Sequence, residues 1–213
     1  MDDVPARIEH TVLGPTTTWA DVTGVLDAAI RHGTRACIPP QHVADATDYA
    51  PGVDLTTVVG FPFGQNATDT KVAEARTAWE EGAAELDLVP DHGRLLGGDV
   101  ESYADDLAEV VAAVPIPVKV IVEPGLLEAD QLQAACEAVV DADADFLKTA
   151  TGYVAGGATT EDVAALAAHL PVKASGGIDS WEIAEAMFEA GAERIGASAG
   201  ETIVEEWDAA TED

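Results

Sequence analysis

The segment EEGAAELDLV, residues 80–89, contains a structural unit that recurs along the chain. An amphipathic stretch ends near Gly82, and a short apolar strand begins two or three residues later. Gly82, like Gly33 and Gly191 in their own units, stands where helices commonly end with a residue in the left-handed conformation. The other units are RHGTRACI (31–38), DADADFLKTA (141–150) and EAGAERIGA (189–197). This recurrence predicts a chain in which helices and strands alternate.

Strand candidates occur eight times, at residues 8–13, 34–38, 55–61, 84–89, 118–123, 145–150, 172–176 and 193–198. Eight short strands separated by helices predict an α/β fold, a TIM (β/α)8 barrel that forms a single domain over residues 1–213. An open doubly wound sheet is the alternative. In a barrel, the active residues gather where the strands end and the following loops begin.

The sequence also indicates where two helices begin and where the last helix ends. Thr18 with Asp21, and Asp179 with Glu182, have the spacing of a capping box. The acidic segment 199–213 is predicted to form a short helix and then a tail that frays from about residue 208.

The chain has 40 acidic residues against ten basic ones, a formal net charge of −30. Its hydrophobic fraction of 47% provides a core and argues against disorder. Such a charge repels itself in dilute buffer, whereas at 1 M salt the screening length falls to roughly 3 Å. The composition favours a protein adapted to a salt-rich cytoplasm over an acidic surface with a dedicated basic partner. It argues against nucleic acid binding, because phosphate contacts need clustered Lys and Arg.

Membrane, disulfide and metal signals are weak. No apolar run approaches the roughly 18 residues of a membrane span, so a soluble cytoplasmic protein is expected. Cys37 and Cys136 do not resemble a disulfide framework, and both are expected to be reduced. No metal site or cofactor is expected, because no ligand spacing is visible among the histidines, which are His10, His32, His42, His92 and His169.

Only four lysines occur, and two of them, Lys148 in FLKTATG and Lys173 in VKASGGI, close short apolar runs. An amine that points from a strand end into a partly dry site can act as a nucleophile. Further polar residues stand at predicted strand ends, and they are costly to bury unless paired, so function is the simplest reason for their presence. These residues are Glu9, Thr11, Cys37, Asp87, Glu123, Thr149, Ser175 and Ser198.

With these lysine motifs, the sequence resembles the deoxyribose-phosphate aldolase family, from about residue 8 to residue 204. The pieces that carry the resemblance are IEHTVL, RACIPP, VVGFPFG, TKVAEARTAWEEGAAELDLV, VKVIVEPGLL, ADFLKTATGY, GGATTEDV, VKASGGI and ERIGASAG. The resemblance implies a class I aldolase, here a salt-adapted, haloarchaeal-like member. Such an enzyme interconverts 2-deoxy-D-ribose 5-phosphate with acetaldehyde and D-glyceraldehyde 3-phosphate.

The resemblance also implies roles for three residues. Lys148 would form the Schiff base, and a free lysine, with a pKa of about 10.4, needs desolvation or a neighbouring cation to become nucleophilic. Lys173 would provide that cation, although an amine there can instead bind the substrate phosphate. Asp87 would relay protons with a water, and holding Lys173 or Lys119 in place is compatible with that role.

Phosphate recognition would use backbone NH groups and hydroxyls in the last loops, where glycine lets the backbone approach the oxygens. The residues are Gly152, Gly176, Gly177, Gly196 and Ser198. Further pocket residues are Glu9, Thr11, Cys37, Lys119 and Thr149. The chain departs from the family pattern at Glu9, usually aspartate, at Pro39, usually asparagine, at Pro124, usually threonine, and at Ala199, usually serine.

Two other functions stay open at this point. The first is a different Schiff-base aldolase or a phosphosugar isomerase on the same barrel, and the second is a phosphosugar-binding protein without turnover. In each case the expected partners are small phosphosugars or aldehydes. A homo-oligomer, first of all a dimer, is expected by resemblance to similar enzymes.

The charge balance generates a prediction for stability. Screening weakens the repulsion among the acidic residues, so the melting temperature should be higher in multimolar KCl than in dilute buffer. Thermal unfolding followed by circular dichroism across a KCl series measures this. A melting temperature independent of KCl would contradict the interpretation of the charge as salt adaptation.

Overall fold

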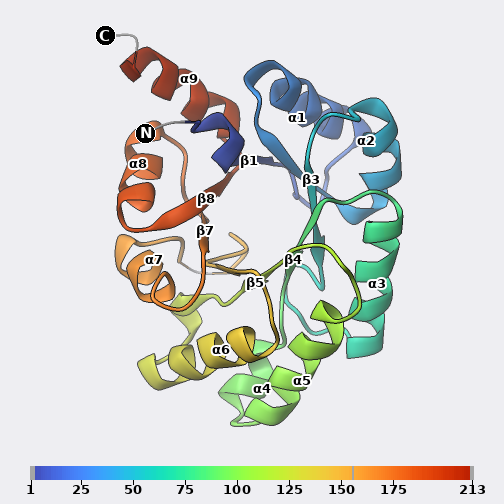
Figure 1. The fold of residues 1–213 in the computed structure, drawn as a ribbon, viewed down its shortest axis with the longest axis vertical. Coiled ribbons are helices and arrows are strands. Elements are labelled where there is room, and N and C mark those ends of the chain that lie inside the picture. Colours follow the sequence, from blue (N-terminus) through green and yellow to red (C-terminus); the bar gives the residue numbers. More distant parts are fainter. Residues whose placement is uncertain (1–2, 155, 212–213) are drawn as a thin grey trace.

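The computed structural model describes residues 3–154 and 156–211, and eight parallel strands within them close into a barrel in the order β1 to β8 (Figure 1). This closure confirms the predicted barrel and excludes the open sheet. The strands are β1 Ile8–Thr11, β2 Arg35–Ile38, β3 Leu55–Val59, β4 Glu85–Leu88, β5 Val118–Ile121, β6 Phe146–Lys148, β7 Val172–Ser175 and β8 Ala192–Ala197.

Helices surround the barrel in an outer ring (Figure 1). They are α1 Trp19–His32, α2 Val43–Tyr49, α3 Thr68–Glu80, α4 His92–Leu96, α5 Val100–Val111, α6 Ala129–Asp141, α7 Thr160–Leu166, α8 Trp181–Glu189 and α9 Gly200–Thr211. Short 3₁₀ turns precede β1 and follow β2 and β5, at Pro5–Arg7, Pro40–His42 and Pro124–Leu126. Among the described residues, no helix combines the length and the apolar character that crossing a membrane requires.

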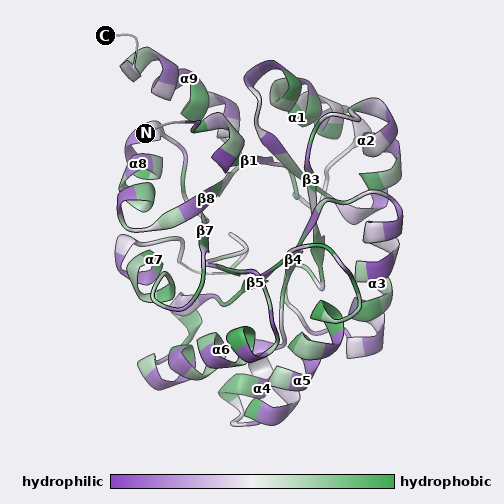
Figure 2. Cartoon of the chain, in the orientation of Figure 1, coloured by the Kyte–Doolittle hydropathy of each residue, from purple (hydrophilic) through white to green (hydrophobic). Residues whose placement is uncertain are grey.

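Each strand directs alternate side chains outward to the helices and inward to the barrel axis. In β4, Leu86 and Leu88 belong to the hydrophobic core, while Glu85 and Asp87 are buried among polar residues. The helices in turn alternate hydrophobic and hydrophilic residues around their circumference (Figure 2). The outward side chains therefore build the core, and the inward positions are free to carry polar chemistry.

The strands are mostly shorter than the patterns predicted. The segment expected at 55–61 ends at Val59, because Gly60 has a φ of 67° and turns the chain out of the sheet. The segment expected at 145–150 is a strand only over Phe146–Lys148. The apolar patterns thus continue into the loops at the barrel mouth.

Helix boundaries follow the capping signals in part. The capping box of Thr18 and Asp21 is confirmed. The start assigned to Asp179 is wrong, because Ser180 is the N-cap and its side chain accepts a hydrogen bond from the Ile183 NH. Helix α9 runs to Thr211, past the predicted onset of fraying near 208. Residues 212–213 lie outside the described part of the chain.

The glycines of the recurring units have the predicted backbone conformation. Gly33, Gly82 and Gly191 have φ angles of 74°, 106° and 112°. At Gly82 a side chain would also collide with Thr47, because a Cβ atom there would lie 2.6 Å from its Oγ1. The cysteines Cys37 and Cys136 are buried and unpaired, as expected.

A buried ion pair joins α3 to α5 in the ring. The Lys71 Nζ donates a hydrogen bond of 2.7 Å to Asp106 Oδ2, and both side chains are at most 1% exposed. The Thr68 hydroxyl donates to the other carboxylate oxygen of Asp106 over 2.8 Å. Because two buried charges are neutralised here, removing one of them leaves the other unpaired.

We expect Asp106→Asn to lower the free energy of unfolding by about 3–5 kcal/mol, because Lys71 then lacks a counter-ion. Asp105→Asn makes the same chemical change at an exposed position of α5 and should alter stability by less than about 0.5 kcal/mol. Urea unfolding in concentrated KCl measures both. Equal stability of the two variants would show that the pair does not support the fold.

Candidate active site

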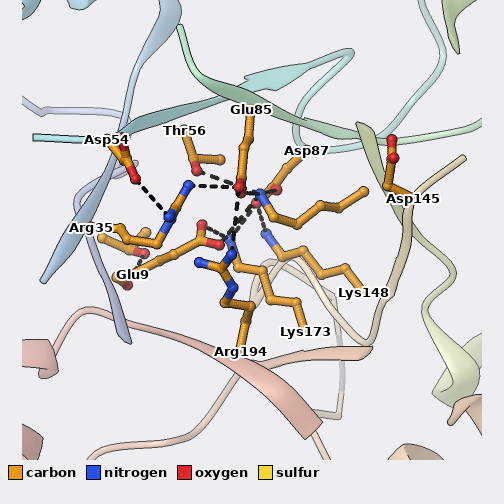
Figure 3. A network of polar contacts seen from close by, with 12 residues as sticks. Glu9, Arg35, Asp54, Thr56, Glu85, Asp87, Asp145, Lys148, Lys173 and Arg194 are labelled. Carbon is orange, nitrogen blue, oxygen red and sulfur yellow. Dashed lines mark hydrogen bonds and ion pairs between the residues drawn. The ribbon is translucent and has the colours of Figure 1, made fainter. Parts of the chain in front are cut away.

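Three of the four lysines converge on one carboxylate inside the barrel (Figure 3). Asp87 on β4 accepts hydrogen bonds at Oδ2 from the Nζ atoms of Lys148 and Lys173, both at 2.7 Å. Its Oδ1 accepts from the Lys119 Nζ at 3.1 Å. Strand register brings these residues together, since Asp87 lies opposite Lys119, and Lys148 lies opposite Lys173.

Glu9 approaches the same amines from β1, which lies next to β8 in the closed barrel. The Lys173 Nζ donates to Glu9 Oε2, and the Lys119 Nζ lies 3.3 Å from Oε1. Both Glu9 and Asp87 are fully buried. The longer side chain at position 9 therefore still reaches the lysines, and the two carboxylates hold three amines between them.

The network fixes the charge of its members. Burial by itself acts to raise the pKa of Asp87, but the surrounding ammonium groups, that of Lys119 first, outweigh it and hold the pKa well below its ordinary value. Burial acts to lower the pKa of Lys173, but the carboxylates of Asp87 and Glu9 outweigh it and raise the pKa. At neutral pH, Asp87 is thus an anion and Lys173 a cation.

A cavity of about 900 Å³ opens above this network at the C-terminal ends of β1, β6, β7 and β8. Lys148, 4% exposed, is the member of the network that lines it. Six more of the predicted site residues also line the cavity: Thr11, Gly152, Gly176, Gly177, Gly196 and Ser198. The cavity has the size of a small-molecule site, with one amine exposed to it and the charged partners of that amine buried beneath.

Four of the five further pocket residues lie outside the lining of this cavity: Glu9 and Lys119, which belong to the network beneath it, and Thr149 and Cys37. Thr149 joins β6 to β7, because its hydroxyl donates to the Ser175 carbonyl and accepts from the Ser175 NH. Cys37 is fully buried on β2, and burial raises its pKa to about 11, so the thiol is protonated at neutral pH. Both side chains are thus fully buried outside the cavity lining, and a role for them in the pocket stays a prediction.

Gly196 has a steric function that its sequence context does not reveal. A Cβ atom at this position would lie 2.6 Å from Lys173 Cε. A side chain on β8 would therefore push Lys173 away from Asp87. Among the predicted phosphate-binding residues, Gly196 thus also makes room for the lysine beneath the cavity.

The family model described as DeoC/LacD family aldolase matches residues 7–205. The chain belongs to the DeoC/LacD family of aldolases. This membership confirms the resemblance carried by the two lysine motifs, and it makes the chain an aldolase, an enzyme that forms or breaks a carbon–carbon bond.

The similarity extends over nearly the whole chain. The deoxyribose-phosphate aldolase of Haloarcula marismortui is 58% identical over 211 residues, which cover 99% of this chain and 91% of that protein. The solved structure titled QR15, an aldolase, matches with a TM-score of 0.95 at 35% identity, covering 99% and 98% of the two chains. The deoxyribose phosphate aldolase from Aeropyrum pernix, described as a unique tetramer, gives 0.90 at 32% identity, covering 97% and 92%.

Three departures from the family pattern border the site. Glu123 has a left-handed backbone with a φ of 46°, followed by Pro124, and its carboxylate accepts from the NH and hydroxyl of Thr151 at 2.7 and 2.6 Å. This contact ties the loop after β6 to the end of β5. Ala199 lines the main cavity, and Pro39 lines a smaller neighbouring one of about 160 Å³.

This aldolase has a second charged layer that the sequence patterns did not predict. Glu85, Arg35 and Arg194 lie beneath the lysines, and Glu85 lies 2.7 Å from the Lys119 Nζ. The available signal was the alternation of β4, since Glu85 precedes Asp87 by two residues and therefore faces the same side.

Two groups of described side chains bring three candidate metal-ligand atoms within 4.8 Å of one another: Glu9 with Cys37 and Asp87, and His32 with Glu201 and Glu205. In the first group, both carboxylates are ion-paired with lysines and the thiol is protonated. In the second, Glu201 pairs with Arg31 at the surface. The first group is therefore part of the lysine–carboxylate network.

Asp87→Asn removes the carboxylate that the three lysines share, so the free energy of unfolding should fall by about 3–5 kcal/mol at neutral pH. Because the folded-state pKa of Asp87 lies below its ordinary value of 3.8, its stabilisation is fully present above that value and is lost as the pH falls below it. The difference between wild type and variant should therefore shrink in acid.

Urea titrations in concentrated KCl, from about pH 7 down to about pH 2, measure this difference. A difference that stayed the same across the series would contradict an ionised Asp87 in the folded protein.

Proposed function

We propose that this aldolase catalyses the reversible cleavage of 2-deoxy-D-ribose 5-phosphate to D-glyceraldehyde 3-phosphate and acetaldehyde through a Schiff base on Lys148. The observation that carries the proposal is the position of the Lys148 amine, which reaches the floor of the cavity while hydrogen-bonded to Asp87. The name and the 58% identity of the Haloarcula marismortui protein support this choice of substrate.

In this mechanism Lys148 attacks the substrate carbonyl as a neutral amine. The carbinolamine loses water, and the resulting protonated imine accepts electrons as the C2–C3 bond breaks and the C3 hydroxyl loses its proton. Glyceraldehyde 3-phosphate leaves, and the remaining enamine is protonated at C2 and hydrolysed to acetaldehyde. Lys148 is thus first a nucleophile and then part of the electron sink.

Asp87 and Lys173 have complementary roles in the proposal. Asp87 Oδ2 contacts both amines, so it is placed to take a proton from Lys148 and, through a water, to return protons to the carbinolamine and the enamine. Lys173, held positive by its two carboxylates, adds a cation beside Lys148 and so favours its neutral form.

The phosphate end of the substrate is proposed to bind at the wall formed by the loops after β7 and β8. Gly176, Gly177 and Ser198 line the cavity there, and α9 begins at Gly200 beside it. Backbone NH groups at such a helix start attract anions. This orientation leaves the sugar carbonyl at the Lys148 end.

We further propose that the enzyme works in a salt-rich cytoplasm, a proposal supported by its net charge of −30, and that it assembles as a homodimer. Large apolar side chains available for such an interface include Trp19 and Tyr49, which are 36% and 47% exposed and stack edge to face. Light scattering in concentrated KCl measures the assembly, and a monomer there would contradict this part of the proposal.

Reductive trapping tests the chemistry. Incubation with 2-deoxyribose 5-phosphate or acetaldehyde in multimolar KCl, followed by borohydride, should give a mass adduct on Lys148. Lys148→Met should abolish the adduct and lower kcat/KM for cleavage by at least about 10³-fold. Lys71, a buried lysine outside the site, is the internal control and should stay unmodified.

The alternatives give different results in the same experiment. An isomerase or a binding protein would form no adduct, which would overturn the proposal if the protein is shown to be folded. Another Schiff-base aldolase would be trapped by its own substrate and would not cleave 2-deoxyribose 5-phosphate.

A further inference from the structure

Glu85 lies at the centre of the second charged layer, and the side chains of Arg35 and Arg194 point toward it (Figure 3). Its Oε1 accepts a hydrogen bond of 2.6 Å from Arg35 and lies 3.7 Å from the Arg194 guanidinium. Its Oε2 lies 2.7 Å from the Lys119 Nζ. The residue is 6% exposed, so three cations surround a carboxylate that has little contact with water.

Lys119 connects this layer to the active site. Its ammonium lies between Glu85 Oε2 and Asp87 Oδ1, at 2.7 and 3.1 Å, and these carboxylates are two residues apart on one strand. Glu9 is the third anion near it, at 3.3 Å. Without Glu85, Lys119 would depend on the two carboxylates that also hold Lys173.

Each of the eight strands contributes a charged or polar group to the network that contains Glu85. Strand register places Thr56 opposite Glu85, and Lys173 opposite Arg194. The groups of the network, taken strand by strand, are Glu9 on β1, Arg35 on β2 with Asp54 beside it, Thr56 on β3, Asp87 on β4, Lys119 on β5, Lys148 on β6, Lys173 on β7 and Arg194 on β8.

We propose that Glu85 is a positioning residue for the reaction: it holds Lys119, and through Lys119 the shared carboxylate of Asp87, and its charge helps to set the pH range of activity. The proposal rests on the imine mechanism at Lys148. Glu85 does not line the cavity and acts only through its neighbours.

The direction of the effect follows from charge. Removing an anion from a buried network disfavours the protonated form of each nearby amine, including Lys148, whose neutral form is the nucleophile. Glu85→Gln should therefore move the acidic limb of the kcat/KM profile to lower pH, by on the order of one unit. Removing a cation should do the opposite, so Arg194→Gln should move that limb to higher pH.

The matched control is a substitution at Asp54, which pairs with Arg35, the arginine that donates to Glu85. Asp54 pairs with Arg35 at 2.8 Å, but its side chain is 61% exposed and does not contact Lys119. Asp54→Asn should leave the acidic limb within about 0.2 unit of wild type in concentrated KCl, where exposed charges are screened.

The experiment is the pH dependence of kcat/KM for 2-deoxyribose 5-phosphate cleavage by wild type, Glu85→Gln, Arg194→Gln and Asp54→Asn, with circular dichroism to verify folding. Opposite shifts in the first two variants, and none in the third, support the proposal. A folded Glu85→Gln with the wild-type profile overturns it, as does an equal shift in Asp54→Asn.

If Glu85→Gln does not fold, Arg194→Gln and Glu85→Asp test the positioning role of Glu85 in its place. The aspartate keeps the charge but shortens the reach, so it should lower kcat while its acidic limb stays near that of wild type. An Arg194→Gln profile identical to wild type would then overturn the proposal. Borohydride trapping separates the two failures, because loss of imine formation in wild type refutes the mechanism, whereas trapping with unchanged profiles refutes only the role of Glu85.

Discussion

The structure depends on the need to neutralise three ammonium groups inside a protein. Lys119, Lys148 and Lys173 are almost entirely buried, and a buried charge is tolerated only when it is paired and hydrogen-bonded. Asp87 meets this need for all three at once, with Glu9 and Glu85 as additional anions. The amine exposed to the cavity is thus almost entirely buried and has the cation Lys173 on the carboxylate that it shares, and desolvation and a neighbouring cation are the two conditions that favour a nucleophilic amine.

The closed barrel makes this pairing geometrically available. Parallel strands direct alternate side chains inward, so residues from strands distant in sequence meet on the axis. Glu9 and Lys173 are 164 positions apart in sequence, yet their side chains are hydrogen-bonded, because β1 and β8 pair to close the barrel. The outward side chains of the same strands bury the hydrophobic core. One set of strands therefore supplies both the stability of the fold and the geometry of the site.

The basic and acidic residues are divided between the interior and the surface. All four lysines are at most 4% exposed, three of them in the site and the fourth paired with Asp106. The surface carries the excess of acidic residues, whose repulsion salt can screen, whereas the charges in the barrel are shielded from the solvent and compensated locally. Adaptation of the surface can proceed independently of the chemistry, because the two sets of charges lie in different dielectric environments.

The sequence by itself was enough to predict the barrel and the candidate nucleophile, because both rest on local patterns. The glycine-punctuated units and the eight apolar runs specified the barrel, since helix ends and strand patterns are properties of neighbouring residues. The motifs around Lys148 and Lys173 identified the candidate nucleophile and its neighbour.

Only the folded chain decided which side chains share the barrel axis. Glu85 joined the network, while Thr149 and Cys37 lay outside the lining of the cavity. The pattern of a strand gives its alternation, but strand register and barrel closure decide which residues meet, and both depend on the packing of the whole chain.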